Sequence, residues 1–221
     1  MATLRSLPRG IVSPWSCVPL FAVVALLPQD IAAQAPEPIV VTSPVLRTGE
    51  LIPRDHSPDG RNLSPPIAWS NLPSGTRQLA VICQDHGAGN PPPWVHWIIY
   101  NIPATATGLP EGVPFDPLEP MPAEIAGAVQ GNNSWGLPMY RGPAPPAESL
   151  HHYHFAVYAL GTELDLPPGL ERDELLAAIE GHVIGEGALV PVYERVPMPD
   201  PWEREDGDLP GGRASADDSP R

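Results

Sequence analysis

The stretch Trp94-Val95-His96-Trp97-Ile98-Ile99-Tyr100-Asn101-Ile102 decides the fold of this chain. It is rich in β-branched and aromatic residues and is bounded by prolines, a pattern that predicts a strand over Trp94–Ile102. A similar apolar run, Leu79–Cys83, precedes it, and the glycine- and proline-rich segment His86–Pro93 between them predicts a loop that turns the chain back. These two strands and their connecting loop form the predicted centre of the domain.

The same strand pattern recurs on both sides of this centre. Four further strand segments are expected, at Ile39–Val41, Ile67–Ser70, Phe155–Leu160 and Ala188–Tyr193. One segment, Arg172–His182, predicts a helix, because its apolar residues recur at helical spacing and its first turn is acidic. Many short strands with one late helix predict a mostly β domain of two sheets.

Composition and charge narrow the classes of function. The chain has 221 residues, of which 42% are hydrophobic, enough for one domain with a substantial core. Its 33 prolines exclude long helices from most of the chain. The formal net charge is −14 and every basic residue is arginine, which argues against nucleic acid and anionic membrane surfaces as partners. An anion site would therefore depend on histidines, backbone N–H groups and a few arginines.

The N-terminus has the pattern of an export signal. Arg5 and Arg9 precede the uncharged segment Ile11–Leu27, and Ala33-Gln34-Ala35 supplies small residues at a cleavage site. Prolines interrupt the apolar run, whereas a membrane span needs about 18 consecutive apolar residues. We therefore expect residues 1–35 to be a signal peptide and the protein to be periplasmic or secreted, with no transmembrane segment after cleavage. A retained anchor is the alternative.

After the predicted cleavage, residues 36–197 are expected to form one domain and residues 198–221 a disordered acidic tail. Cys17 lies in the predicted signal, so no intramolecular disulfide is expected, and Cys83 in its apolar run is expected to be a buried thiol. No cofactor motif or diagnostic metal-ligand spacing is present, so no cofactor and no metal are expected. The sequence leaves the oligomeric state open.

Three clusters contain residues capable of binding chemistry. Asp85 ends the first apolar run, His96 lies within the aromatic strand, and His151 and Tyr153 follow a proline-rich loop. Each has a structural explanation when taken alone, since a histidine on an aromatic strand is commonly a core residue and an aspartate at a strand end is commonly a turn former. Their joint occurrence, in this order, is more informative.

The clusters belong to a longer ordered pattern. It consists of the segments Asn62–Ser70 (NLSPPIAWS), Val95–Pro103 (VHWIIYNIP), Tyr140–Pro146 (YRGPAPP) and His151–Leu160 (HHYHFAVYAL). In order and spacing this pattern resembles the phosphatidylethanolamine-binding proteins, and in particular their bacterial Raf-kinase-inhibitor-like branch, over roughly residues 45 to 195. The resemblance implies two antiparallel sheets, a short C-terminal helix and a shallow cavity near one end.

The resemblance also implies a ligand site. The residues expected to bind phosphate or a phospholipid head group are Asp85, His96, Gly142, Pro143, His151 and Tyr153. Imidazole and phenol groups can donate hydrogen bonds to phosphate oxygens, and a carboxylate can orient an imidazole or accept from a head-group amine. The family's D-P-D-x-P loop is here Asp85-His86-Gly87-Ala88-Gly89, so its second aspartate and both prolines are absent.

The resulting hypothesis is a non-catalytic protein that binds a small anion or a phospholipid head group. Modulation of a kinase or protease is a further hypothesis, and export would place such a protein target outside the cytoplasm. The first alternative is a metal-binding or hydrolytic protein that uses His96, His151 and Asp85. The second is a partner-binding domain whose pocket is vestigial, an option that the altered loop keeps open.

Overall fold

The computed structural model describes residues 38–91, 93–116 and 118–195. The expected signal peptide, residues 1–35, and the expected tail, residues 198–221, lie outside the described residues and stay predictions. Within the described ranges, no helix is long and apolar enough to cross a membrane.

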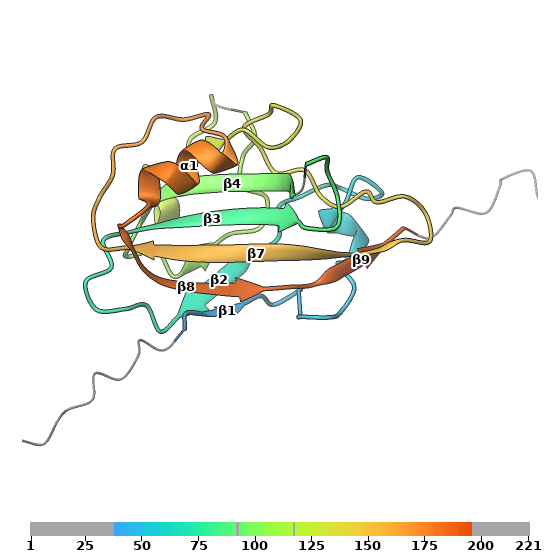
Figure 1. The fold of residues 1–221 in the computed structure, drawn as a ribbon, viewed down its shortest axis with the longest axis horizontal. Coiled ribbons are helices and arrows are strands. Elements are labelled where there is room, and N and C mark those ends of the chain that lie inside the picture. The colour runs from blue at the N-terminus through green and yellow to red at the C-terminus, as the bar shows by residue number, and fades with distance from the viewer. Residues whose placement is uncertain (1–37, 92, 117, 196–221) are drawn as a thin grey trace, which may run out of the picture. The chain divides into compact units, whose positions relative to one another are not determined.

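Two antiparallel sheets form the domain, as Figure 1 shows. The smaller sheet has the order β1-β2-β5, with β1 at Val40–Thr42, β2 at Ile67–Ser70 and β5 at Gly108–Leu109. The larger sheet has the order β6-β4-β3-β7-β8, and β9 pairs with β7 outside this path. Its strands are β3 Gln78–Asp85, β4 Trp94–Pro103, β6 Val129–Gly131, β7 Leu150–Leu160, β8 Val183–Leu189 and β9 Val192–Glu194. The predicted fold class is confirmed.

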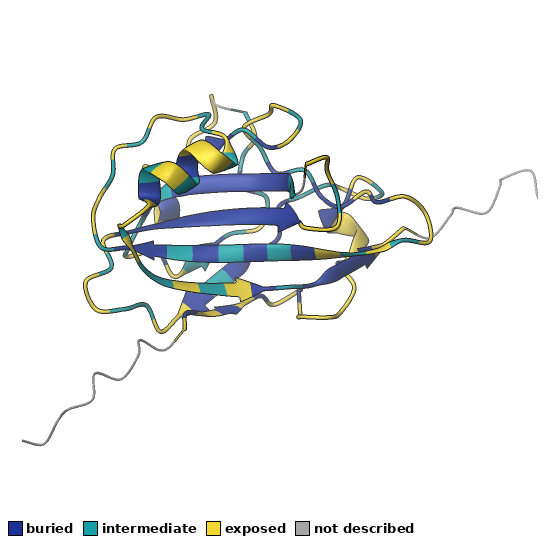
Figure 2. Ribbon diagram, in the orientation of Figure 1, coloured by how far each residue is buried: buried dark blue, intermediate teal, exposed yellow. Residues whose placement is uncertain are grey.

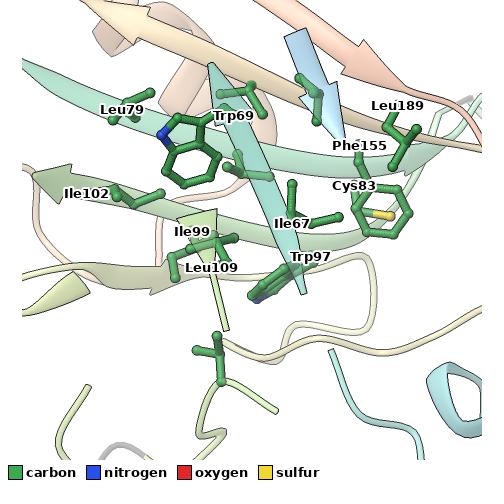
Figure 3. Packing of buried hydrophobic residues seen from close by; sticks show 14 of the residues in the cluster. Ile67, Trp69, Leu79, Cys83, Trp97, Ile99, Ile102, Leu109, Phe155 and Leu189 are labelled. Carbon is green, nitrogen blue, oxygen red and sulfur yellow. The ribbon is translucent and has the colours of Figure 1, made fainter. Parts of the chain in front are cut away.

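The central strand β3 is buried along its whole length, because both faces of the larger sheet are covered (Figure 2). Side chains alternate between the faces of a strand. Leu79, Val81 and Cys83 pack into the core that contains β2 of the smaller sheet (Figure 3). Ala80 and Ile82 pack on the other face, in the cluster that contains residues of the helix. Cys83 is 1% exposed, so the expected buried thiol is confirmed.

The helix α1, Arg172–Ile179, covers the second face of the larger sheet. Its first turn is closed by a capping box, in which the side chains of Glu171 and Glu174 each accept from the other residue's backbone N–H. Leu175 and Ile179 are buried against the sheet. The helix ends before the predicted His182, because Glu180 leaves the helical conformation and Gly181 adopts a positive φ of 76°.

The strand predictions differ from the structure in extent and in number. β7 begins at Leu150 rather than Phe155, the predicted strand Ala188–Tyr193 is split between β8 and β9, and the short strands β5 and β6 were not predicted. The start of β8 was missed because glycines weaken the strand pattern. Gly187 is required there, since a Cβ would collide with the backbone of Ile39.

Candidate functional site

The candidate site lies at the edge of the larger sheet where β3 ends and where β4 and β7 begin. Asp85, the last residue of β3, is paired with Trp94 on β4 and with Tyr153 on β7. A cavity of about 310 Å³ opens at this point. Asp85 of the central strand is thus flanked by an aromatic residue on each side, Trp94 on β4 and Tyr153 on β7.

A β-bulge directs His96 to this cavity. Along β4, Trp97 pairs with Cys83 and Val95 pairs with Gln84, so His96 is the extra residue between them. Its carbonyl oxygen accepts from the N–H of Arg141 instead of from β3. The side chain of His96 is 4% exposed and contributes to the cavity wall.

Asp85, His151 and Ser149 form a hydrogen-bonded chain at the cavity rim. Nδ1 of His151 lies 2.6 Å from Oδ2 of Asp85, and Nε2 of His151 lies 2.9 Å from Oγ of Ser149. The carboxylate can only accept, so Nδ1 of His151 donates to it, and in a neutral ring Nε2 then accepts from the serine hydroxyl. The other carboxylate oxygen of Asp85 accepts from the N–H of Gly87 at 2.8 Å. Both nitrogens of His151 are therefore engaged within the protein.

The ring of His96 is held differently, by one hydrogen bond to a backbone carbonyl. Nδ1 lies 2.7 Å from the carbonyl oxygen of Arg141, so Nδ1 donates. Burial lowers the pKa of His96, against the opposing effects of the Arg141 backbone and the Asp85 charge. Burial thus disfavours the protonated ring, whereas the backbone of Gly142, like that of Arg141, favours it.

Tyr153 contributes a phenol group to the same cavity. The residue is 1% exposed, lines the cavity and has no hydrogen-bond partner for its hydroxyl among the described residues. Burial, followed by the negative charge of Asp85, raises its pKa far above the usual value. The hydroxyl therefore keeps its proton and can donate to a ligand.

Aromatic rings and prolines complete the walls. Trp94 and Trp135 meet edge to face with ring centroids 5.2 Å apart, and the guanidinium of Arg141 lies 4.5 Å from the Trp135 ring centre. The opposite wall is formed by Ala144, Pro145 and Pro146. Proline has no N–H, so this wall offers few backbone donors to an anion.

Four of the six residues expected from the sequence line the cavity, namely Asp85, His96, His151 and Tyr153. The structure does not place Gly142 or Pro143 on its surface; the following residues of the same loop take that position. Gly142 is buried, and its N–H donates to Oδ1 of Asn62 at 2.9 Å. Its role is to anchor the loop.

Sequence reasoning missed Trp135 and Ser149. Trp135 lies in the segment Gly131–Gly136, where an aromatic residue among small polar ones is a usable signal. Ser149 stands two positions before His151, and nothing in that spacing predicts contact between them. The loop residues Ala88 and Gly89 also line the cavity.

A second hollow lies on the outer side of β7, lined in part by His86, His152 and His154. The ring centroids of His86 and His154 are 4.6 Å apart. Burial, and then the charges of His86 and His152, lower the pKa of His154. Among the described residues, no group of three or more histidine, cysteine, aspartate or glutamate side chains is placed to hold a metal ion.

The fold and the site together define a class of protein. The chain matches the family model described as phosphatidylethanolamine-binding protein over residues 42–194. The chain therefore belongs to the phosphatidylethanolamine-binding protein family, as the sequence pattern had predicted.

Relatives and solved structures agree with this assignment. The chain is 45% identical over 144 residues to a UPF0098 protein of Methanothermobacter thermautotrophicus, covering 65% of this chain and 91% of the relative. It resembles the crystal structure of Escherichia coli YbcL with a TM-score of 0.65 and 34% identity, covering 71% of this chain and 98% of YbcL. A homologue from Chlamydia trachomatis matches with a TM-score of 0.63 and 31% identity, covering 72% and 98%.

Proposed function

We propose that the protein binds a small phosphate-bearing ligand in the cavity formed by Asp85, His96, His151 and Tyr153. One observation carries this proposal: polar groups from three different strands meet in a single cavity of about 310 Å³ with aromatic and proline walls. Ligand sites are commonly apolar pockets with a few convergent polar groups. Family membership supports a binding role in general, and the Tyr153 hydroxyl, which keeps its proton, is a donor suited to a phosphate oxygen.

The hydroxyl of Tyr153 gives the proposal its sharpest test. A hydrogen bond to a charged ligand contributes about 1.5–3 kcal/mol, so Tyr153→Phe is expected to weaken the binding of phosphoethanolamine and of inorganic phosphate by roughly 10- to 100-fold. Isothermal titration calorimetry on the purified chain measures this directly. His182→Gln is the matched control, because His182 follows α1 and does not line the cavity.

The control variant should bind like the unsubstituted protein, and both variants should unfold at similar temperatures. Absence of binding by either compound to the unsubstituted protein, or equal binding by Tyr153→Phe, would overturn the proposal. The first outcome would favour a partner-binding domain with a vestigial pocket.

A second function is favoured by the chain that joins Asp85, His151 and Ser149. Its order of carboxylate, imidazole and hydroxyl is the arrangement that activates a serine nucleophile. In ester cleavage, Oγ of Ser149 would attack the carbonyl carbon while its proton passes to Nε2 of His151. The alcohol would leave with that proton, and water would then hydrolyse the acyl-serine.

Labelling with a fluorophosphonate tests this second function. Covalent modification at Ser149, seen by peptide mass spectrometry, is expected to disappear in Ser149→Ala and in His151→Gln. Ser74→Ala is the control, since Ser74 is an exposed serine outside the cavity. If the unsubstituted protein is not labelled at Ser149 after long incubation, the hydrogen-bonded chain has a structural role and not a catalytic one.

A further inference from the structure

A group of three histidines lies on the outer side of β7, outside the ligand cavity. His152 and His154 are two positions apart on the strand, so their side chains share the face opposite to that of Tyr153. His86 follows the end of β3 and lines the same hollow, whose volume is about 470 Å³. Together, His86, His152 and His154 form the histidine cluster.

Two rings of the cluster already have the separation of a metal-binding pair. The ring centroids of His86 and His154 are 4.6 Å apart, and the ring planes are inclined by 81°. Two imidazoles at neighbouring positions of one ion, each with a metal–nitrogen bond of about 2.0 Å, have ring centres roughly 4.5–5.1 Å apart. The observed separation falls within this range, so ring rotation without backbone movement can direct one nitrogen of each ring towards a common ion.

The three rings are not fixed in place by their surroundings. His86 is exposed, and its ring has one long hydrogen-bonding contact, 3.3 Å between its Nε2 and Nε2 of Gln84. His152 is also exposed, and His154 is half-buried with its ring against that of His86. The rings can therefore turn towards an ion without the loss of a short hydrogen bond.

His152 supplies the third nitrogen only after its side chain turns. As the side chains stand, no three histidine, cysteine, aspartate or glutamate side chains within the described ranges converge on one ion. Same-face neighbours on a strand lie about 6.6 Å apart along the chain, a span that two imidazoles can bridge onto one ion. Since His152 is exposed, its ring can turn towards His154, and water would complete the coordination.

The lining of the hollow favours one class of ion. Of the described residues that line it, four are histidines and none carries a carboxylate. Calcium and magnesium ions prefer oxygen ligands, whereas imidazole suits copper, nickel and zinc, and copper(II) binds such nitrogen sites most tightly. The fourth histidine, His151, is not counted as a ligand, because both of its nitrogens lie within hydrogen-bond distance of Asp85 and Ser149.

We propose that the histidine cluster binds one copper(II) ion through His86 and His154, with His152 as the third ligand. The formal net charge of −14 favours the approach of a cation. This site is separate from the proposed phosphate cavity and does not depend on what that cavity binds.

Isothermal titration calorimetry on the full chain without a histidine tag tests the proposal, with copper(II) added as its glycine complex to keep it in solution. One copper(II) per chain is expected, bound at least roughly tenfold more tightly than zinc, and calcium should not compete for the site. His86→Gln and His154→Gln should each weaken copper(II) binding by roughly tenfold or more, because each removes one nitrogen ligand. His182→Gln is the matched control, since His182 follows α1 and does not line this hollow.

Electron paramagnetic resonance counts the ligands independently, because each bound imidazole nitrogen splits the copper(II) signal. In a buffer without nitrogen ligands, two or three nitrogens are expected for the unsubstituted protein and one fewer for His154→Gln. Equal melting temperatures of the variants without copper(II) show that a loss of binding is not a loss of the fold.

The failing outcomes are equally specific. No binding of copper(II), or the same affinity and nitrogen count in both variants, would overturn the proposal. Loss of binding in His151→Gln but not in His86→Gln would place the ion at the ligand cavity and would overturn it too. Several weak equivalents that His86→Gln does not alter would mean separate binding to single histidines. Each of these failures leaves the phosphate proposal unaffected, because that proposal is tested with phosphate compounds and Tyr153→Phe.

Discussion

Substitution of Gly142 by alanine is expected to destabilise the protein by about 3 kcal/mol, which lowers its melting temperature by roughly 10 °C. A Cβ at this position would lie 2.8 Å from Cα of Ser57 and well inside contact distance of the carbonyl group of His56. The obstructing atoms are backbone and cannot rotate away. The segment that contains Gly142 must then move as a unit.

That movement would reach the cavity. The same segment is held by the Tyr140 hydroxyl, which donates to the carbonyl of His56 at 2.7 Å, and by the bond from Gly142 to Asn62. Its carbonyl at Arg141 fixes the ring of His96. We therefore expect Gly142→Ala to weaken phosphoethanolamine binding as well as stability, although Gly142 does not line the cavity.

Gly181→Ala is the control for this prediction. Gly181 has a φ of 76° and open space around its Cα, so alanine there costs conformational strain of about 1 kcal/mol and no collision. Chemical denaturation of the two variants gives the comparison. Equal losses of stability would mean that the contact between Gly142 and His56 is looser than the structure shows.

The fold was largely predictable because its central strands follow simple rules. β3 and β4 are continuous apolar runs, the pattern of strands buried on both faces, and their glycine- and proline-rich boundaries were visible. β8 was not predictable in the same way. Its glycines are explained by contacts with Ile39 and Pro73, residues far away in the chain, and no local pattern reports such contacts.

The candidate site was predictable as a set of residue types and not as a geometry. The resemblance to a family brought Asp85 and His96 into one cavity, and the structure places them there. The bulge that turns His96 inward depends on a one-residue change of register between β3 and β4. The bonds that engage both nitrogens of His151 depend on where Ser149 lies. Such details decide whether a histidine donates or accepts, and they require tertiary structure.

The Asp85 carboxylate is expected to be the polar group of the cavity whose removal costs most stability. It is 1% exposed and accepts from Nδ1 of His151 and from the N–H of Gly87. Asp85→Ala leaves Nδ1 of the largely buried His151 ring without its acceptor, whereas the N–H of the exposed Gly87 can bond to water, so a loss of about 1–3 kcal/mol in the free energy of unfolding is expected. Urea denaturation measures it, and a loss below about 1 kcal/mol would contradict the bond to His151.

Asp85→Asn is the informative comparison with Asp85→Ala, because the asparagine amide has the shape of the carboxylate but only one oxygen. The amide oxygen can still accept from Gly87, while its NH2 group faces Nδ1 of His151 and requires that nitrogen to accept. The ring must then carry its proton on Nε2, which becomes a donor to the oxygen of Ser149. We expect a stability loss of about 1 kcal/mol and a change of tautomer visible in the ¹⁵N chemical shifts of the imidazole. Because this tautomer cannot take a proton from Ser149, any fluorophosphonate labelling of that serine must disappear in Asp85→Asn while the fold persists; labelling that survives would show that His151 does not activate Ser149.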